Sequence, residues 1–514
     1  GKQMQNGSSI HKTHWFCYSH NMTYGSYRGL ETIPALLIWG AFALAVALSF
    51  FAPIFAIGFI IIFDSYWMFR VLYFVVFVLI SWHSFREARK IDWLQKLKLE
   101  VDDFEQYWHL VFLPTYKEPK EVIEATLKSL LASSYPKSRM MILLGGEERD
   151  KEAFLKIADE MKAKYGESFA RFFITVHSAN LPDEIPGKGS NMNFMGREVK
   201  KYVDEIGLPY SRIIVSAFDV DTLAHKDYFA HLAFVYATAK NQTRASYQPV
   251  VLFNNNMWES PAPVRVMAFG TTFWLMGELA RPERLWTFSS HSMPFQMLVD
   301  VGFWQKDIVS EDSRIFLQAL KRYQGDYRVE PLYLPVSMDA VASAGYLKSL
   351  VALYKQQRRW AWGVEHFPYI VVEIWRDKAI AFKTRFRVIF NHIEGMFTWA
   401  TAPVLIFILG WLPIYVAGQN PDVLVYNAPF TLQWMMRVAA VGVFVFGAVS
   451  FTLLPHRPDH AHPWRFATMV LQWVLLPVTF IILGAIPAID AQTRLAFGKY
   501  LGFNVTEKRR EKKN

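Results

Sequence analysis

The chain has 514 residues, of which 52% are hydrophobic and 16% aromatic, and its formal net charge is +10. This apolar content exceeds that of an ordinary globular protein and is concentrated toward both ends, which indicates a membrane protein with a polar middle. The single cysteine, Cys17, excludes an intrachain disulfide framework and a cysteine-rich zinc site. Basic runs at 85–90 and 508–513 adjoin apolar stretches, as cytosolic membrane flanks do, so no nucleic-acid partner is needed to explain the charge.

Two apolar segments near the N-terminus are long enough to cross a bilayer, which takes about 20 helical residues. We expect one helix at 33–51 and a second at 57–82, with Pro53 between them. The second helix carries Asp64 and Arg70, which are expected to face protein or the membrane surface because charge in lipid is costly. The opening residues lack the basic and short apolar regions of a secretory signal, so no signal peptide is expected.

The middle of the chain, from residue 90 to about 345, alternates short apolar runs with amphipathic stretches such as 120–133. This alternation is typical of a soluble α/β domain. It favours a mostly parallel sheet with the ligand site at the carboxyl ends of the strands. The expected strands are 109–113, 140–144, 171–177, 212–218 and 248–253.

The last third of the chain returns to membrane character. Basic and apolar residues interleave at 367–377 and 382–395, which predicts helices lying in the membrane interface. Three apolar runs follow, at 396–416, 432–455 and 466–487. Three full crossings would place the basic C-terminal tail opposite the central domain, against its charge, so the last run is either a span or a re-entrant or interfacial segment.

An acidic pair, Asp219 and Asp221, follows the expected strand at 212–218. Residues two apart on a strand point the same way, so both carboxylates can face one site at the strand end. Mg²⁺ and Mn²⁺ prefer oxygen ligands and are often shared between one or two carboxylates and a phosphate, which a nucleotide diphosphate would supply. The alternative is a turn or a helix cap, where Asp and Thr are common.

A second acidic pair, Glu311 and Asp312, stands between Ser310 and a helical pattern. A carboxylate at a helix start can serve as a general base beside bound substrate. The same residues also fit a capped helix N-terminus, and both interpretations stay open from this motif alone.

The stretch LYKQQRRWAWGVEH, residues 353–366, combines cations and indoles. A helix from Leu347 would bring Gln356, Arg359 and Trp360 near one another. Arginine offers a planar fork to phosphate oxygens, and an indole offers a flat face to a sugar ring. The alternative is a basic and aromatic helix that lies in the membrane interface.

These three motifs, taken in order, resemble those of the membrane-embedded family 2 glycosyltransferases, whose relatives include cellulose, chitin and hyaluronan synthases. PTYKEP at 114–119 and GKGSNMN at 187–193 resemble the nucleotide-binding elements of that family, and FNVTEK at 503–508 fits the F-x-V-T-x-K gating loop of cellulose synthase-like enzymes. The resemblance covers roughly residues 107–365 and the tail. One departure lies after the second expected strand, where Gly145 and Gly146 stand in place of the usual acidic residue and the first acids are Glu147 and Glu148.

The resemblance implies a GT-A-type α/β domain between transmembrane helices and an inverting reaction that uses Mg²⁺ or Mn²⁺. Asp312 would be the general base, with Glu311 shaping the site, while Asp219 and Asp221 would hold nucleotide and metal. Trp360 would form the acceptor platform. The remaining donor-binding residues would be Thr115, Tyr116, Glu118, Lys188, Gln356 and Arg359, and the gating residues Phe503, Val505, Thr506 and Lys508.

The resemblance also implies a domain order: an N-terminal segment with two transmembrane helices at 1–90, the glycosyltransferase domain at 91–365, interfacial helices at 366–395, and a C-terminal transmembrane region with the gating tail at 396–514. The chain would be integral to a plasma or inner membrane, with its catalytic domain in the cytosol. We expect a processive synthase of the β-glucan type, which passes sugar from a nucleotide sugar such as a UDP-hexose to a growing polysaccharide and moves the product through the membrane.

Two other functions stay open. A non-processive transferase would add one sugar to a lipid carrier or glycolipid, and the motifs fit it equally well apart from the gating tail. A transporter or receptor could carry a domain that only binds nucleotide, but it would need neither a base nor an acceptor platform.

Overall fold

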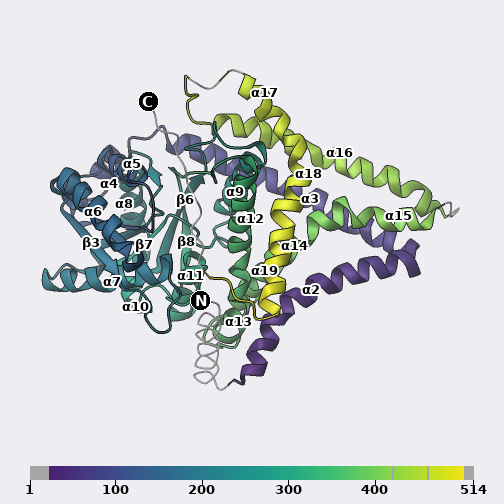
Figure 1. The fold of residues 1–514 in the computed structure, drawn as a ribbon, viewed down its shortest axis with the longest axis horizontal. Helices are drawn as coiled ribbons and strands as arrows, with labels where there is room; N and C mark the ends of the chain where they lie inside the picture. Colours follow the sequence, from purple (N-terminus) through teal and green to yellow (C-terminus); the bar gives the residue numbers. More distant parts are fainter. Residues whose placement is uncertain (1–21, 419–421, 460–461, 463, 503–514) are drawn as a thin grey trace.

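The computed structural model describes residues 22–418, 422–459, 462 and 464–502. A mixed α/β domain lies on one side of the molecule, and long helices extend away from it on the other (Figure 1). The chain between the helices α3 (Pro53–Ala88) and α14 (Phe382–Phe407) builds the domain. Both ends of the described chain therefore belong to the helical side.

One eight-stranded sheet, in the order β3-β2-β1-β4-β7-β6-β8-β5, forms the centre of this domain. The pairs β3–β2, β2–β1, β1–β4 and β6–β8 are parallel, whereas β7 is antiparallel to both its neighbours and β5 is antiparallel to β8. The strands are β1 (Trp108–Pro114), β2 (Met140–Glu147), β3 (Arg171–His177), β4 (Ile213–Ala217), β5 (Leu223–Ala224), β6 (Ala245–Leu252), β7 (His291–Pro294) and β8 (Arg328–Ser337).

All five strands expected from the sequence are present, as β1, β2, β3, β4 and β6. Three were missed. β8 contains Pro331 and Pro335, which argue against a strand because proline cannot donate to a sheet ladder. β7 has only four residues and β5 only two, so neither is long enough to show an alternation of apolar and polar residues.

Helices pack on the sheet through apolar faces, as the alternation of the sequence predicts. The expected helix at 120–133 is α5 (Lys120–Leu131), which buries Val122, Ile123 and Leu127. The other helices of this part are α4 (Trp93–Glu100), α6 (Lys151–Tyr165), α7 (Lys188–Glu205), α8 (Tyr228–Thr238), α9 (Ala262–Leu279), α10 (Phe295–Val301), α11 (Glu311–Arg322), α12 (Tyr346–Ala361) and α13 (His366–Tyr369).

Two glycines at the end of β2 allow this close packing. A Cβ added to Gly145 would lie 2.4 Å from the Sδ atom of Met195 on α7, and one added to Gly146 would lie 2.3 Å from the ring of Phe154 on α6. Real Cβ atoms do not approach other atoms so closely. The glycines that replace the acidic residue of the family pattern therefore have a packing role.

Four described helices are individually long and apolar enough to cross a membrane: α2 (Tyr24–Phe51), α3, α16 (Val423–Thr452) and the continuous helical stretch Trp464–Ala496. A fifth candidate is the pair of α14 with the helical turns Leu409–Ala417, which bends by 46° at residue 408. The last stretch contains α17 (Trp464–Leu471), α18 (Leu476–Thr479) and α19 (Ile486–Ala496), and α15 is Leu412–Ala417. All five expected apolar runs are therefore largely helical.

These helices have two different settings (Figure 1). α2, α3, α15 and α16 reach away from the sheet, whereas α18 packs beside α9 and α19 beside α12. Arg70 of α3 forms an ion pair with Glu394 of α14, so this charge faces protein, as expected from the cost of charge in lipid.

The two amphipathic stretches differ in burial. His366–Trp375 is largely buried and contacts α11. The second stretch opens α14, which continues past residue 395, and it exposes Phe382, Phe386 and Phe390 along one face. The expected boundary at 395 thus falls inside a helix.

We predict that Gly146→Ala lowers the stability of the α/β domain by about 1–3 kcal/mol, because the new methyl group overlaps the Phe154 ring. The matched control is Gly29→Ala, at an exposed helical glycine with no neighbour within 4 Å, which should be neutral or stabilising. Melting temperatures of the two purified variants in one detergent measure this. Equal melting temperatures would contradict the packing role of Gly146.

Candidate active site

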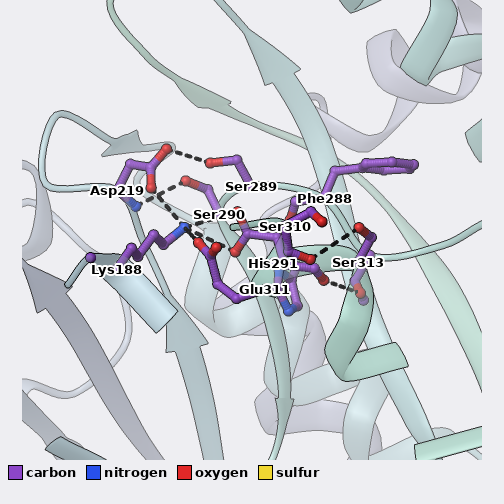
Figure 2. A network of polar contacts seen from close by, with 12 residues as sticks. Lys188, Asp219, Phe288, Ser289, Ser290, His291, Ser310, Glu311 and Ser313 are labelled. Carbon is purple, nitrogen blue, oxygen red and sulfur yellow. Dashed lines mark hydrogen bonds and ion pairs between the residues drawn. The ribbon is translucent and has the colours of Figure 1, made fainter. Parts of the chain in front are cut away.

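The buried ammonium group of Lys188 joins residues from three distant parts of the sequence (Figure 2). Its Nζ atom lies 2.7 Å from Oδ1 of Asp219, 2.9 Å from Oδ1 of Asp312 and 3.9 Å from Oε1 of Glu311. Lys188 is the first residue of α7, Asp219 follows β4, and the acidic pair opens α11. The structure thus brings together three of the motifs that the sequence singles out.

Charge pairing sets the protonation of this cluster. Burial alone would lower the pKa of Lys188, but Asp219, Asp312 and Glu311 together raise it above its usual value, so the side chain stays charged. Burial raises the pKa of Glu311 well above that of an exposed glutamate, and the neighbouring Asp312 adds to this, while Lys188 and Arg359 oppose it. Glu311 therefore holds a proton more readily near neutral pH than an exposed glutamate does.

The two carboxylates of the D-x-D motif do not share one environment. β4 ends at Ala217, so Asp219 and Asp221 lie beyond the strand and the two-residue alternation assumed for them does not apply. The Asp219 side chain is 26% exposed and accepts a 2.6 Å hydrogen bond from Ser289. Asp221 is fully buried, and its Oδ2 atom accepts a 3.0 Å hydrogen bond from the backbone N–H of Asp339.

Asp312 lies in the first turn of α11 with part of its carboxylate exposed, whereas Glu311 is buried. The side chain of Ser310 makes no capping bond to this helix, contrary to the capping interpretation. The carbonyl oxygen of Asp312 accepts a 2.6 Å hydrogen bond from Thr287. The first turn is thus held by bonds that leave the Asp312 carboxylate pointing to Lys188.

The expected helix from Leu347 is α12, and it carries Gln356, Arg359 and Trp360, all half-buried. Arg359 is near enough to lower the pKa of Glu311, which places its charge beside the acidic pair. The ring of Trp360 packs 5.8 Å from that of Phe253, which follows β6. This stretch therefore borders the cluster around Lys188.

The expected nucleotide residues lie after β1. Thr115 is buried, and its backbone N–H donates to Gly145 at 2.7 Å. Glu118 accepts a hydrogen bond from the N–H of Tyr116. The guanidinium of Arg149 lies 4.4 Å from the centre of the Tyr116 ring and also pairs with Glu147 at the end of β2.

Arg149 and Ser289 join the site without having been predicted. Arg149 is only four residues beyond Gly145 in LLGGEERD, so its place after a strand was a usable signal. Ser289 belongs to no motif, and only the fold brings it to Asp219.

The expected gating residues Phe503, Val505, Thr506 and Lys508 lie outside the described residues. The chain before them is fixed next to α12: the ring of Tyr500 meets that of Trp362 at 6.4 Å, and its hydroxyl lies 2.8 Å from Oε2 of Glu31. Arg28 pairs with Glu31 and donates to the carbonyl oxygens of Leu495 and Ala496.

A divalent cation fits this site only together with a phosphate ligand. Among the described residues, no group of three or more His, Cys, Asp and Glu side chains is arranged to hold an ion. Asp219 offers a partly exposed carboxylate, and Mg²⁺ often takes one or two carboxylates plus substrate phosphates. The carboxylate oxygens of Asp219 are hard ligands, which Mg²⁺ and Mn²⁺ prefer.

Comparisons with known proteins give only distant matches. No protein family and no curated protein matches the chain. Among solved structures, it is similar to the mannosyltransferase PcManGT from Pyrobaculum calidifontis in complex with GDP-Man and Mn²⁺, with 16% identity and a TM-score of 0.43 over 83% of this chain and 99% of that one. It is also similar to residues 1–349 of S. aureus TarS in complex with UDP-GlcNAc, with 13% identity and a TM-score of 0.36 over 68% and 94% of the two chains. Likeness this weak does not establish a family or an activity.

Proposed function

We propose that the chain is a membrane-embedded glycosyltransferase that moves a hexose from a nucleotide sugar to an acceptor hydroxyl with inversion. The observation that carries this proposal is the contact of Lys188 with both Asp219 and Asp312. This contact brings together the proposed base Asp312, the cation Lys188 and the proposed nucleotide-binding carboxylate Asp219, from segments about 30 and 90 residues apart. A single displacement at the donor sugar needs all three groups close together. The resemblance of the motifs to family 2 glycosyltransferases supports the same reaction.

The proposed reaction is a single displacement. The acceptor oxygen attacks the anomeric carbon as its proton passes to the carboxylate of Asp312. The bond from the anomeric carbon to the phosphate oxygen breaks, and the leaving nucleoside diphosphate takes its electron pair. Lys188 and Arg359 offset the negative charge that develops on the leaving diphosphate. An α-linked donor therefore yields a β-linkage, because the attack comes from the opposite face.

A divalent cation would be held by the partly exposed Asp219 together with the donor phosphates, while the buried Asp221 would support this loop through its hydrogen bond from Asp339. When bound, it would supply further positive charge at the leaving group. The single charge of Lys188 does not balance Asp219, Asp312 and a diphosphate together, which is the physical reason to expect a cation.

The finer proposal is a processive synthase of the β-glucan type that uses a UDP-hexose. The FNVTEK tail supports it, because the pattern fits the gating loop of cellulose synthase-like enzymes. The basic flanks at 85–90 and 508–513 support a cytosolic catalytic domain. Translocation of the polysaccharide would use the apolar helices that lie beside the site.

A second candidate is transfer to a lipid carrier or glycolipid, and one groove favours it. This groove, of about 500 Å³, lies between α12 and the stretch Val478–Leu483. Its walls include Val351 and Ile482, both exposed, and Lys355 and Arg358 border it. A hydrocarbon chain with an anionic head group suits such a lining.

Purified protein in detergent, supplied with radiolabelled nucleotide sugars, tests both candidates. Long polymer extracted from the reaction supports the processive synthase, and a single-sugar lipid supports the second candidate. Donor binding without transfer to any acceptor would contradict both and favour a nucleotide-binding domain without enzymatic function.

We predict that Asp312→Asn lowers the rate of transfer by about 10²-fold or more, because it preserves size and hydrogen bonding but removes the base. Affinity for the donor should change little. Initial rates at saturating donor, with titration calorimetry for affinity, measure the two quantities. Near wild-type turnover would require another base.

We predict that excess EDTA abolishes transfer and that Mg²⁺ or Mn²⁺ restores it. The reason is that Lys188 alone carries too little positive charge to offset Asp219, Asp312 and a bound diphosphate. Product formation before and after dialysis against the chelator provides the measurement. Full turnover in EDTA would exclude the metal assignment while leaving the base assignment intact.

We predict that Arg359→Ala and Trp360→Ala fail in different ways. Loss of Arg359 should weaken binding of the free nucleoside diphosphate by roughly 1.5–3 kcal/mol, the range for a hydrogen bond to a charged group. Loss of Trp360 should preserve this affinity and abolish transfer, because it removes an apolar face from the acceptor. Calorimetry and a transfer assay on both variants decide the matter, and equal losses of nucleotide affinity would disprove the division of roles.

A further inference from the structure

The carboxylate of Glu365 binds the chain just before the proposed base. Its Oε1 atom accepts hydrogen bonds from the backbone N–H groups of Val309 and Ser310, at 3.3 and 3.2 Å, and from the hydroxyl of Ser310 at 2.6 Å. Ser310 is the residue that precedes α11. Ser310, which the local sequence predicts as the cap of α11, thus donates its hydrogen bonds to a carboxylate 55 residues away in the sequence.

The other oxygen of Glu365 faces the acceptor-side helix. Oε2 accepts a 3.0 Å hydrogen bond from the indole N–H of Trp362, two residues beyond Trp360. One side chain therefore bridges the start of the base-bearing helix and the end of the helix that carries Arg359 and Trp360.

Adjacent residues repeat this connection. The Nε2 atom of His366 lies 2.8 Å from the Ser313 hydroxyl, and Nε of Arg314 donates to its Nδ1 atom at 3.2 Å. The Arg314 guanidinium also lies 4.1 Å from the centre of the Tyr369 ring. The consecutive residues Glu365 and His366 thus bond to four residues on either side of Asp312, namely Val309, Ser310, Ser313 and Arg314.

Burial makes these bonds consequential. The Glu365 carboxylate is enclosed by protein, and burial raises its pKa, an effect opposed first by the bond from Ser310 and then by Arg314. A buried carboxylate that loses its donors is left without the water that would solvate its charge, which is costly. The donors of both elements must therefore keep their positions around it.

We infer that Glu365 is a positioning residue for the reaction: it fixes the base Asp312 relative to Arg359 and Trp360, so that base, leaving-group contact and acceptor platform keep one geometry. This inference rests on the proposed function. It assigns a role to a residue that is not proposed to touch the substrates and lies beyond Gln356, Arg359 and Trp360 in the chain.

The test is a double-mutant cycle with Glu365→Gln and Asp312→Asn in the full-length protein. The amide places an N–H donor where an acceptor is needed, opposite Trp362 or Ser310. We expect Glu365→Gln to lower kcat at least about 10-fold, with the dissociation constant of the nucleoside diphosphate changed less than about 3-fold. In the Asp312→Asn background, the same change should lower the residual rate less than about 2-fold.

Glu278→Gln is the matched control, since Glu278 is also a buried glutamate but lies on α9 and pairs with Arg281, just beyond the end of that helix. It should leave kcat within about 2-fold. Equal losses from Glu365→Gln in both backgrounds, or an unchanged kcat, would overturn the inference. Full activity of Asp312→Asn alone would instead refute the proposed base, so the two failures are distinguishable.

Ser310→Ala and Trp362→Phe cover the case in which Glu365→Gln does not fold, recognised by loss of nucleotide binding. Each variant removes one donor and leaves the carboxylate in place. We expect each to lower kcat about 2- to 10-fold with nucleotide affinity retained. Unchanged kcat in both variants would count against a positioning role.

Discussion

The ion cluster around Lys188 is the constraint on which the arrangement of the site depends. One buried ammonium neutralises carboxylates that come from the loop after β4 and from the start of α11. Removing one partner from a buried ion pair typically costs about 3–5 kcal/mol, because the remaining charge stays unsolvated. The close approach that this pairing needs is possible because residue 189 is glycine: a Cβ there would lie 3.0 Å from Cβ of Glu311 and 3.1 Å from the carbonyl oxygen of Gln305.

The same charges serve binding in the proposed reaction. Without donor, Lys188 is the counter-ion of Asp219 and Asp312. When the donor binds, its diphosphate would compete with these carboxylates for Lys188, and a divalent cation would compete with Lys188 for Asp219. A diphosphate that binds Lys188 would replace part of the contact between Lys188 and Asp312. Donor binding and the contacts of Asp312 would then be linked through one lysine.

The sequence predicts regular, local features well and side-chain environments poorly. Five strands and the helix at 347–361 follow from periodicity, whereas β8 is hidden by Pro331 and Pro335. Lys188, Asp219 and Asp312 belong to motifs that the sequence already assigns to one site, and the structure brings them into contact. The different burial of Asp219 and Asp221 depends instead on where β4 ends. Glu365 gave no signal, because its partners Val309 and Ser310 are 55 or more residues away in the sequence.

The helical side of the molecule also bears on the acceptor. α19 packs along α12, and Arg358, the neighbour of Arg359, forms a 2.9 Å ion pair with Asp490 of α19. Tyr500 meets Trp362, while Arg28 of α2 binds the carbonyl oxygens at the end of α19. α12 is therefore held between α11, through Glu365, and the apolar helices, through Arg358. In the proposed reaction, an acceptor that rests on Trp360 would therefore be fixed relative to both the proposed base and the apolar helices, as transfer to either a growing polysaccharide or a lipid requires.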